Sequence, residues 1–86
     1  MSSDDLEREL GRHLRSVRIA RKFSQVELAE LANVSVGALQ HLERGEGATT
    51  ATLVKVLRAL GREDWLSTLA PPATFNPLEL LEVRRK

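Results

Sequence analysis

The chain has 86 residues, of which 42% are hydrophobic and 29% charged, and these proportions fit one folded domain rather than a disordered or fibrous protein. It contains no Cys, which excludes disulfides and thiolate zinc sites. Its net charge of +1, from 13 basic and 12 acidic residues, indicates neither an acidic nor a basic partner. A chain of this length buries only about 60% of its unfolded surface, so we expect a partner subunit to add stability.

The two histidines, His13 and His41, show no metal-ligand spacing, and no residue pattern indicates a cofactor. No apolar run approaches the roughly 20 residues that span a bilayer. The first five residues carry two Asp, whereas a secretory signal begins with positive charge followed by an apolar stretch. The sequence therefore predicts a cytoplasmic protein with no metal site, cofactor or membrane segment.

The first predicted element is a helix over residues 3–21, with Ser3 or Asp4 as its N-cap. Apolar residues recur in it at intervals of four and three, which places them on one stripe: Leu6, Leu10, Leu14 and Val17.

Basic residues also recur along this helix, after an acidic start: Arg8, Arg12, Arg15, Arg18, Arg21 and Lys22. One interpretation is a helix whose charges complement its own dipole, acid first and base last. The other is a basic edge that faces phosphate. The two interpretations are compatible.

A capping box, Ser24-x-x-Glu27, predicts the start of a second, short helix. This helix is expected to stop near Asn33, a residue type that tolerates the left-handed conformation. Ser35 then caps a third helix over residues 36–43. The sequence therefore predicts two short helices joined by a turn of a few residues.

Gly45 is expected to end the third helix, and Thr49 or Thr50 to begin a fourth that closes at Gly61. The fourth helix is predicted to bury its apolar residues: Leu53, Val54, Val56, Leu57 and Leu60. A fifth helix is predicted over residues 62–69.

Pro71 and Pro72 are predicted to end the compact region, because consecutive prolines cannot continue a helix. The sequence thus predicts an all-α fold, with one helical domain over residues 1–70 and a short C-terminal extension over residues 71–86.

Residues 14–60, LRSVRIARKFSQVELAELANVSVGALQHLERGEGATTATLVKVLRAL, resemble the Cro/repressor-type helix-turn-helix family, also called the XRE family. About ten positions agree in order and spacing, among them the SQ start of the second helix, the ELA that follows it and the LE-x-G end of the third. The resemblance implies a five-helix lambda-repressor-like domain that binds double-stranded DNA by placing its third helix in the major groove.

The resemblance assigns DNA contact to residues around the third helix: Gln25, Ser35, Val36, Gly37, Gln40, His41 and Arg44. Gln40 carries the donor and acceptor that suit adenine, and Val36 can pack on a thymine methyl group. Gln25 and Arg44 are expected to hold phosphate. His41 either donates to DNA or is an exposed histidine without a task.

Two residues depart from the family pattern. Gly37 stands where many relatives carry a long polar side chain, so either the backbone approaches the bases closely or readout depends more on DNA shape. Lys22 stands where relatives often have glycine or asparagine; Lys22 and Ser24 are further candidate phosphate contacts. By the same resemblance, Arg18 and Glu43 form a partly buried ion pair with a structural role.

A repressor of this kind is expected to bind a palindromic operator as a homodimer, and no catalytic constellation is visible, which predicts that it is not an enzyme. Residues after the fourth helix are candidates for the dimer or partner interface: Trp65, Leu66, Leu69, Phe75 and Leu78. Alternatively, Trp65 only seals the core.

Residues 59–86 are also similar to small XRE-type regulators, called HipB-like, that are encoded beside HipA-like kinase toxins. This similarity implies an antitoxin that binds operator DNA and also docks a HipA-like kinase. A third hypothesis is a helical adaptor that never touches DNA.

Overall fold

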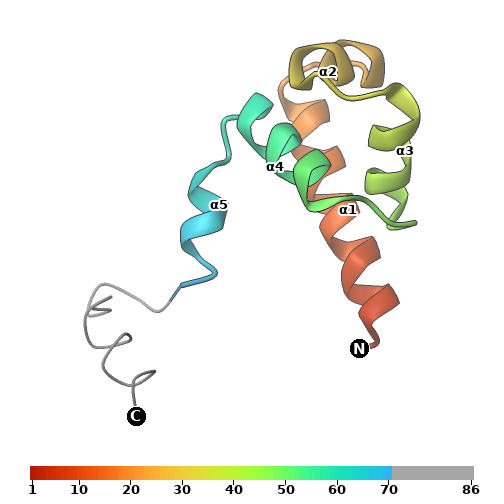
Figure 1. Cartoon of the computed structure of the whole chain (residues 1–86), viewed down its shortest axis with the longest axis vertical. Coiled ribbons are helices and arrows are strands. Elements are labelled where there is room, and N and C mark those ends of the chain that lie inside the picture. Colours follow the sequence, from red (N-terminus) through yellow and green to blue (C-terminus); the bar gives the residue numbers. More distant parts are fainter. Residues whose placement is uncertain (71–86) are drawn as a thin grey trace.

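The structure is a computed structural model that describes residues 1–70, and every regular element within that range is a helix, which confirms the predicted all-α class (Figure 1). The helices are α1 (Ser3–Ala20), α2 (Gln25–Ala32), α3 (Val36–Arg44), α4 (Thr50–Ala59) and α5 (Asp64–Ser67).

Side-chain caps start the first four helices. Ser2, rather than Ser3 or Asp4, caps α1: its hydroxyl accepts from the Asp5 N–H, and the Asp5 carboxylate accepts from the Ser2 N–H, each at 3.1 Å. In a capping box, the side chain of the third helical residue accepts from the N–H of the N-cap. Since Asp5 is the acidic residue that makes this bond, the cap is the residue three positions before it, Ser2.

Residues with a left-handed backbone conformation follow the first three helices. Lys22 after α1, Asn33 after α2 and Gly45 after α3 have φ angles of 62°, 59° and 70°. At each of them the backbone turns away and the next helix can start within a few residues. The turn between α2 and α3 is therefore short and closed at both ends.

The core lies where the first four helices meet. Its largest fully buried side chains are aliphatic: Leu14, Leu28, Leu39, Val56 and Leu60. Helix α3 packs against α1, α2 and α4, and α2 packs against α4, whereas α5 makes no comparably extensive contact. Helix α3 is therefore held from three sides.

Two further predicted features differ from the structure. Val54, expected in the core, is 41% exposed, because α4 buries only the side that carries Val56 and Leu57. The fifth helix is four residues long instead of eight. No side chain caps its start, and the hydroxyls of Ser67 and Thr68 each donate to the carbonyl three residues back, which competes with longer helical bonding.

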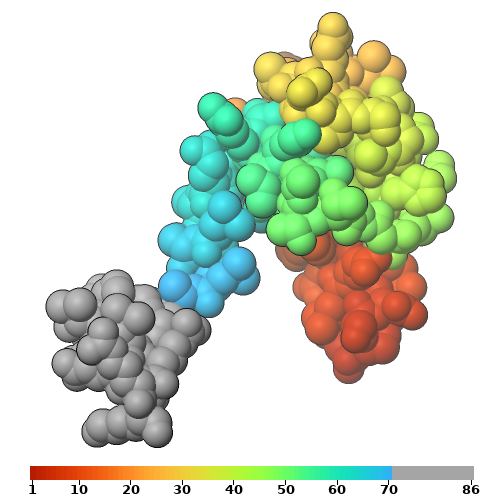
Figure 2. Space-filling view, in the orientation of Figure 1, coloured from red at the N-terminus to blue at the C-terminus, as the bar shows by residue number. Residues whose placement is uncertain are grey.

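The N-terminal part of α1 protrudes below the bundle in Figure 2, and the segment after α4 extends away from it on the other side. In keeping with this, Leu6 on the first turns of α1 is 52% exposed, although it shares the apolar stripe with Leu14. Within residues 1–70, no helix combines the length and the apolar character needed to cross a membrane.

Candidate nucleic-acid interface

Helices α2 and α3 are joined by the three residues 33–35. The Asn33 N–H donates to the Glu30 carbonyl and the Val34 N–H to the Ala29 carbonyl, which completes the end of α2. The Ser35 hydroxyl then accepts from the Ala38 N–H at 3.0 Å and caps α3. Local hydrogen bonds thus fix both ends of the turn and the direction in which α3 starts.

Helix α3 has one buried and one exposed side. Leu39, Leu42 and Glu43 are buried. The exposed side carries four of the residues assigned to DNA: Ser35, Gly37, His41 and Arg44. A Cβ atom added to Gly37 would meet nothing within 4 Å, so no contact inside the protein requires glycine there.

Val36 and Gln40 lie at the boundary between these two sides. Val36 was expected on the outward face, but it is half-buried and packs against the core, because it precedes the buried Leu39 by three residues. Gln40 is half-buried as well, because its amide points toward α2. The freely exposed part of the predicted recognition surface is therefore smaller than the sequence indicated.

Two glycines bring α3 close to α1. A Cβ atom on Gly11 would lie 2.6 Å from the Leu42 carbonyl oxygen and closer still to that of Glu43. A Cβ atom on Gly45 would lie 2.6 Å from the Cα atom of Arg8. Gly11 was not among the predicted contact residues, although its position three residues before Leu14 and seven before Arg18 places it on the inner stripe of α1.

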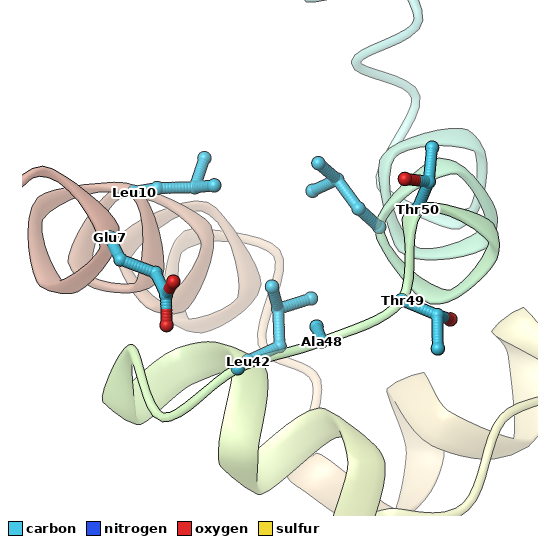
Figure 3. A pocket seen from close by; sticks show the side chains of 8 residues that line it. Glu7, Leu10, Leu42, Ala48, Thr49 and Thr50 are labelled. Carbon is cyan, nitrogen blue, oxygen red and sulfur yellow. The ribbon is translucent and has the colours of Figure 1, made fainter. Parts of the chain in front are cut away.

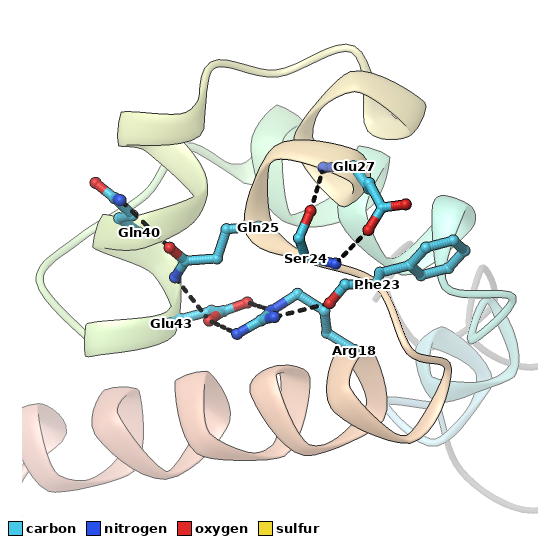
Figure 4. A network of polar contacts seen from close by, with 7 residues as sticks. All are labelled: Arg18, Phe23, Ser24, Gln25, Glu27, Gln40 and Glu43. Carbon is cyan, nitrogen blue, oxygen red and sulfur yellow. Dashed lines mark hydrogen bonds and ion pairs between the residues drawn. The ribbon is translucent and has the colours of Figure 1, made fainter.

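A polar network joins α1, α2 and α3 beside this contact (Figure 4). The Arg18 Nε donates to Glu43 Oε2 at 2.7 Å, Arg18 Nη2 donates to Glu43 Oε1 at 3.1 Å, and Arg18 Nη1 donates to the Phe23 carbonyl at 2.9 Å. Both side chains of the ion pair are buried, at 10% and 3% exposed. The structure therefore brings Arg18 and Glu43 together.

The network continues toward the exposed side of α3. Gln25 Nε2 donates to Glu43 Oε1 at 3.2 Å, and Gln40 Nε2 donates to Gln25 Oε1 at 3.3 Å. Figure 4 shows the Gln40 oxygen pointing away from Gln25. No sequence pattern indicated this connection, because Gln25 and Gln40 lie on different helices.

The other residues assigned to phosphate are placed as follows. Lys22 is exposed, and its backbone has a left-handed conformation. Ser24 is exposed, but its hydroxyl caps α2 by accepting from the Glu27 N–H, and the Glu27 carboxylate accepts from the Ser24 N–H. Hydrogen bonds from the backbone and the side chain of Ser24 lower the pKa of Glu27. Arg44 Nε lies 3.8 Å from Glu46 Oε1 on the surface, a pair that water screens.

The basic residues of α1 do not form one continuous edge. Arg18 is buried in the ion pair, and Arg8 donates to Asp5 at 2.6 Å. The hydrogen bonds from Ser2, followed by the one from Arg8, lower the pKa of Asp5. The arrangement of Asp5 at the start of α1 fits the dipole interpretation of the charge pattern.

The candidate dimer residues lie around α5. Trp65 is half-buried and packs against the core, whereas Leu66 and Leu69 are 40% and 82% exposed. Trp65 also lines a shallow pocket with three other residues, Leu10, His13 and Thr68. Phe75 and Leu78 lie outside the described residues.

A second pocket, of about 150 Å³, opens between α1, the loop before α4 and α4 itself (Figure 3). Leu10, Leu42 and Leu53 line it, and Glu7 is its only ionisable residue. Its volume is below the roughly 300 Å³ of usual small-molecule sites. Within residues 1–70, no group of three or more His, Asp or Glu side chains is placed to hold a metal ion.

Two capped helices joined by a tight turn, with the second supported from behind by other helices, define the class of helix-turn-helix proteins. The family model described as Helix-turn-helix matches residues 14–66, and the chain belongs to this family, in its XRE-type branch. Members are DNA-binding transcriptional regulators, and this is the general function of the chain. No curated protein matches it.

Proposed function

We propose that the chain is a repressor that binds a palindromic operator as a homodimer, with α3 of each subunit in the major groove. The supporting observation is the exposed side of α3, whose opposite side is fixed to α1 by Gly11 and by the Arg18–Glu43 pair. A helix held in this way presents the same side chains to each operator without further ordering, which favours specific binding.

In this proposal, base edges are read by Gln40, by Val36 at its remaining exposed edge and by the backbone near Gly37. Phosphates are held around them by Gln25, Ser35, Arg44 and the candidate contacts Lys22 and Ser24, while His41 adds a donor. The open space at Gly37 favours close approach of the α3 backbone to DNA, because no packing within the protein calls for glycine.

The proposed dimer places two copies of α3 about 34–36 Å apart, one turn of DNA. Its interface uses Trp65, Leu66 and Leu69 together with Phe75 and Leu78 of the extension. The exposure of Leu66 and Leu69 supports this assignment, since apolar side chains gathered beyond a small core favour association. The division into a domain of residues 1–70 and an extension of residues 71–86, the cytoplasmic location and the absence of catalysis or a cofactor belong to the same proposal.

The same exposed leucines also favour a second candidate function, an antitoxin that docks a HipA-like kinase while it represses its own operon. DNA binding uses α3, so the surface around α5 is free for a protein partner. The two functions differ in what residues 71–86 do: their removal spares DNA binding if they serve a kinase, and damages it if they hold the dimer.

The test is a fluorescence titration against the DNA upstream of the gene at several salt concentrations. Affinity is expected to fall steeply with salt, with a log–log slope of about 0.9 per neutralised phosphate. Selection of bound oligonucleotides from a random pool is expected to return a palindrome. A slope near zero would contradict phosphate contact, and an asymmetric single site would contradict the dimer.

A further inference from the structure

The inference concerns Gln25 and rests on the proposed function. Three side chains form a chain of hydrogen bonds from the buried ion pair to the surface: Glu43, Gln25 and Gln40. Gln25 and Gln40 are the only glutamines in the sequence. We propose that Gln25 is a positioning residue for base recognition. Glu43 can only accept hydrogen bonds, so it sets the orientation of the Gln25 amide, and Gln25 in turn fixes which way the Gln40 amide faces the DNA.

The direction of the hydrogen bonds follows from the chemistry of the first member. A carboxylate paired with a guanidinium accepts hydrogen bonds and donates none, so the Gln25 amide must turn its Nε2 toward Glu43. The Gln25 oxygen then faces Gln40, and an amide oxygen only accepts. Gln40 must therefore turn its own Nε2 inward, which the structure shows at 3.3 Å.

This orientation leaves Gln40 with its oxygen and one N–H free, and Figure 4 shows the oxygen directed away from the network. An acceptor beside a donor is the pair that adenine requires at its N6 and N7 positions. An unsupported glutamine has to lose the freedom of its side chain and choose between two amide orientations when it binds. Gln40 has made that choice before DNA arrives, because Gln25 and Glu43 hold it.

Gln25 keeps one Nε2–H that is not used toward Glu43, so its amide can still donate to phosphate. The two roles predict different results. A phosphate contact raises the affinity for all sequences equally, whereas a positioning role changes the preference for one base. If a Gln25 variant loses both roles, its affinity falls for all sequences, and only the change in base preference reports the positioning role.

The first experiment uses nuclear magnetic resonance on the full chain without DNA. The spectrum contains few side-chain amides: Gln25, Gln40, Asn33 and Asn76. Asn33 is exposed and serves as the reference for a free amide. We expect slower hydrogen exchange at Gln40 than at Asn33, and Gln25→Met to abolish the difference. If Gln40 exchanges like Asn33 in the unsubstituted protein, the hydrogen-bonded chain is absent and the inference fails.

The second experiment compares Gln25→Met, Gln40→Met and the double variant on the selected operator and on one with the Gln40 base pair changed. Each single variant is expected to lose the preference for that base pair, on the order of tenfold, and the double variant to lose no more. Val26→Met is the control, because Val26 is an exposed neighbour in α2 outside the network. Thermal unfolding confirms that each variant is folded.

Two other results distinguish failure of the positioning role of Gln25 from failure of the proposed function. If Gln25→Met weakens every sequence equally and Gln40→Met keeps its full effect in that background, Gln25 acts only on phosphate and the inference is wrong. If the unsubstituted protein discriminates no base pair, the proposed function fails, and the recognition role of Gln25 fails with it. The exchange experiment decides independently whether Gln25 orients Gln40 in the free protein.

Discussion

Gly11 in α1 and Glu43 in α3 are in direct backbone contact, and the absence of a side chain on Gly11 allows it. A Cβ atom there would come within 2.6 Å of the Leu42 carbonyl oxygen and nearer to that of Glu43. The same α3 residue carries the carboxylate that pairs with Arg18. Backbone packing and the buried ion pair therefore fix the same end of α3, and the N-terminal half of α3 remains outside this contact, available for the proposed binding to DNA.

Gly11→Ala is expected to destabilise the protein by about 1–3 kcal/mol, because the carbonyls it meets belong to a helix backbone and cannot move aside alone. The matched control is Gly37→Ala, at an exposed helical position with open space, which is expected to gain up to about 1 kcal/mol from helix propensity. Urea unfolding of both variants measures the two changes. Equal effects would contradict the close contact of α1 and α3.

These two glycines illustrate that a sequence predicts local features of the backbone better than contacts between distant helices. The caps of α2 and α3 were predictable, because Ser24, Ser35 and Asn33 act on backbone groups within three or four residues of themselves, whereas the cap of α1 was predicted one or two residues too late. The distance between α1 and α3 was not, because it depends on how four helices pack together. Gly11 was consequently not predicted to make a special contact, whereas Gly37 was singled out as a departure from the family pattern.

The same distinction holds for the candidate site. The Arg18–Glu43 pair and the exposed side of α3 followed from a family resemblance, which carries tertiary information that spacing does not. The link from Gln25 to Gln40 depends on the angle between α2 and α3. The partial burial of Val36, by contrast, follows from its position three residues before Leu39 and was missed. The short α5 reflects weak local signals: its first residues offer no cap, and hydroxyl side chains compete for its carbonyls.

Glu43→Ala is expected to cost about 3–5 kcal/mol, since it leaves the Arg18 guanidinium buried without its partner. A domain of this size has only about 0.05–0.15 kcal/mol of stability per residue, so the variant should be largely unfolded by circular dichroism. The double variant Arg18→Met with Glu43→Leu removes both charges and should fold again. Failure of the double variant to recover would show that shape, rather than charge, dominates at this contact.

Lys22→Gly is expected to stabilise the protein by about 0.5–1 kcal/mol. Lys22 has a φ angle of 62°, a conformation that strains a residue with a Cβ atom, although the entropy of glycine in the unfolded chain offsets part of the gain. Asn33→Gly is the comparison, because asparagine tolerates its φ of 59° and should gain less. Thermal unfolding should rank the two variants in this order, and the reverse order would contradict strain at Lys22.

The capping box at α2 predicts a pH dependence. Hydrogen bonds from Ser24 lower the pKa of Glu27 in the folded state, so this carboxylate contributes stability above its unfolded pKa and loses that contribution as the pH falls through the folded pKa. Glu27→Gln keeps a side-chain acceptor but does not titrate. The difference in unfolding free energy between the two proteins should shrink as the pH falls from about 5 to 3. A constant difference would show that the charge of Glu27 has no role.

Gln40→Ala and Arg44→Ala should separate base reading from phosphate contact. Gln40 offers a free acceptor and donor at the edge of α3, so its loss should cost about 1–3 kcal/mol on the preferred base pair and little elsewhere. Arg44 is exposed and only loosely paired with Glu46, so its loss should weaken all sequences alike and lower the salt slope by about 0.9. Glu46→Gln, which removes the carboxylate 3.8 Å from Arg44 Nε, should raise affinity for all sequences. Titrations on matched and altered operators measure all three, and identical sequence profiles for Gln40→Ala and Arg44→Ala would contradict the assignment, because a residue that reads a base cannot lower affinity uniformly.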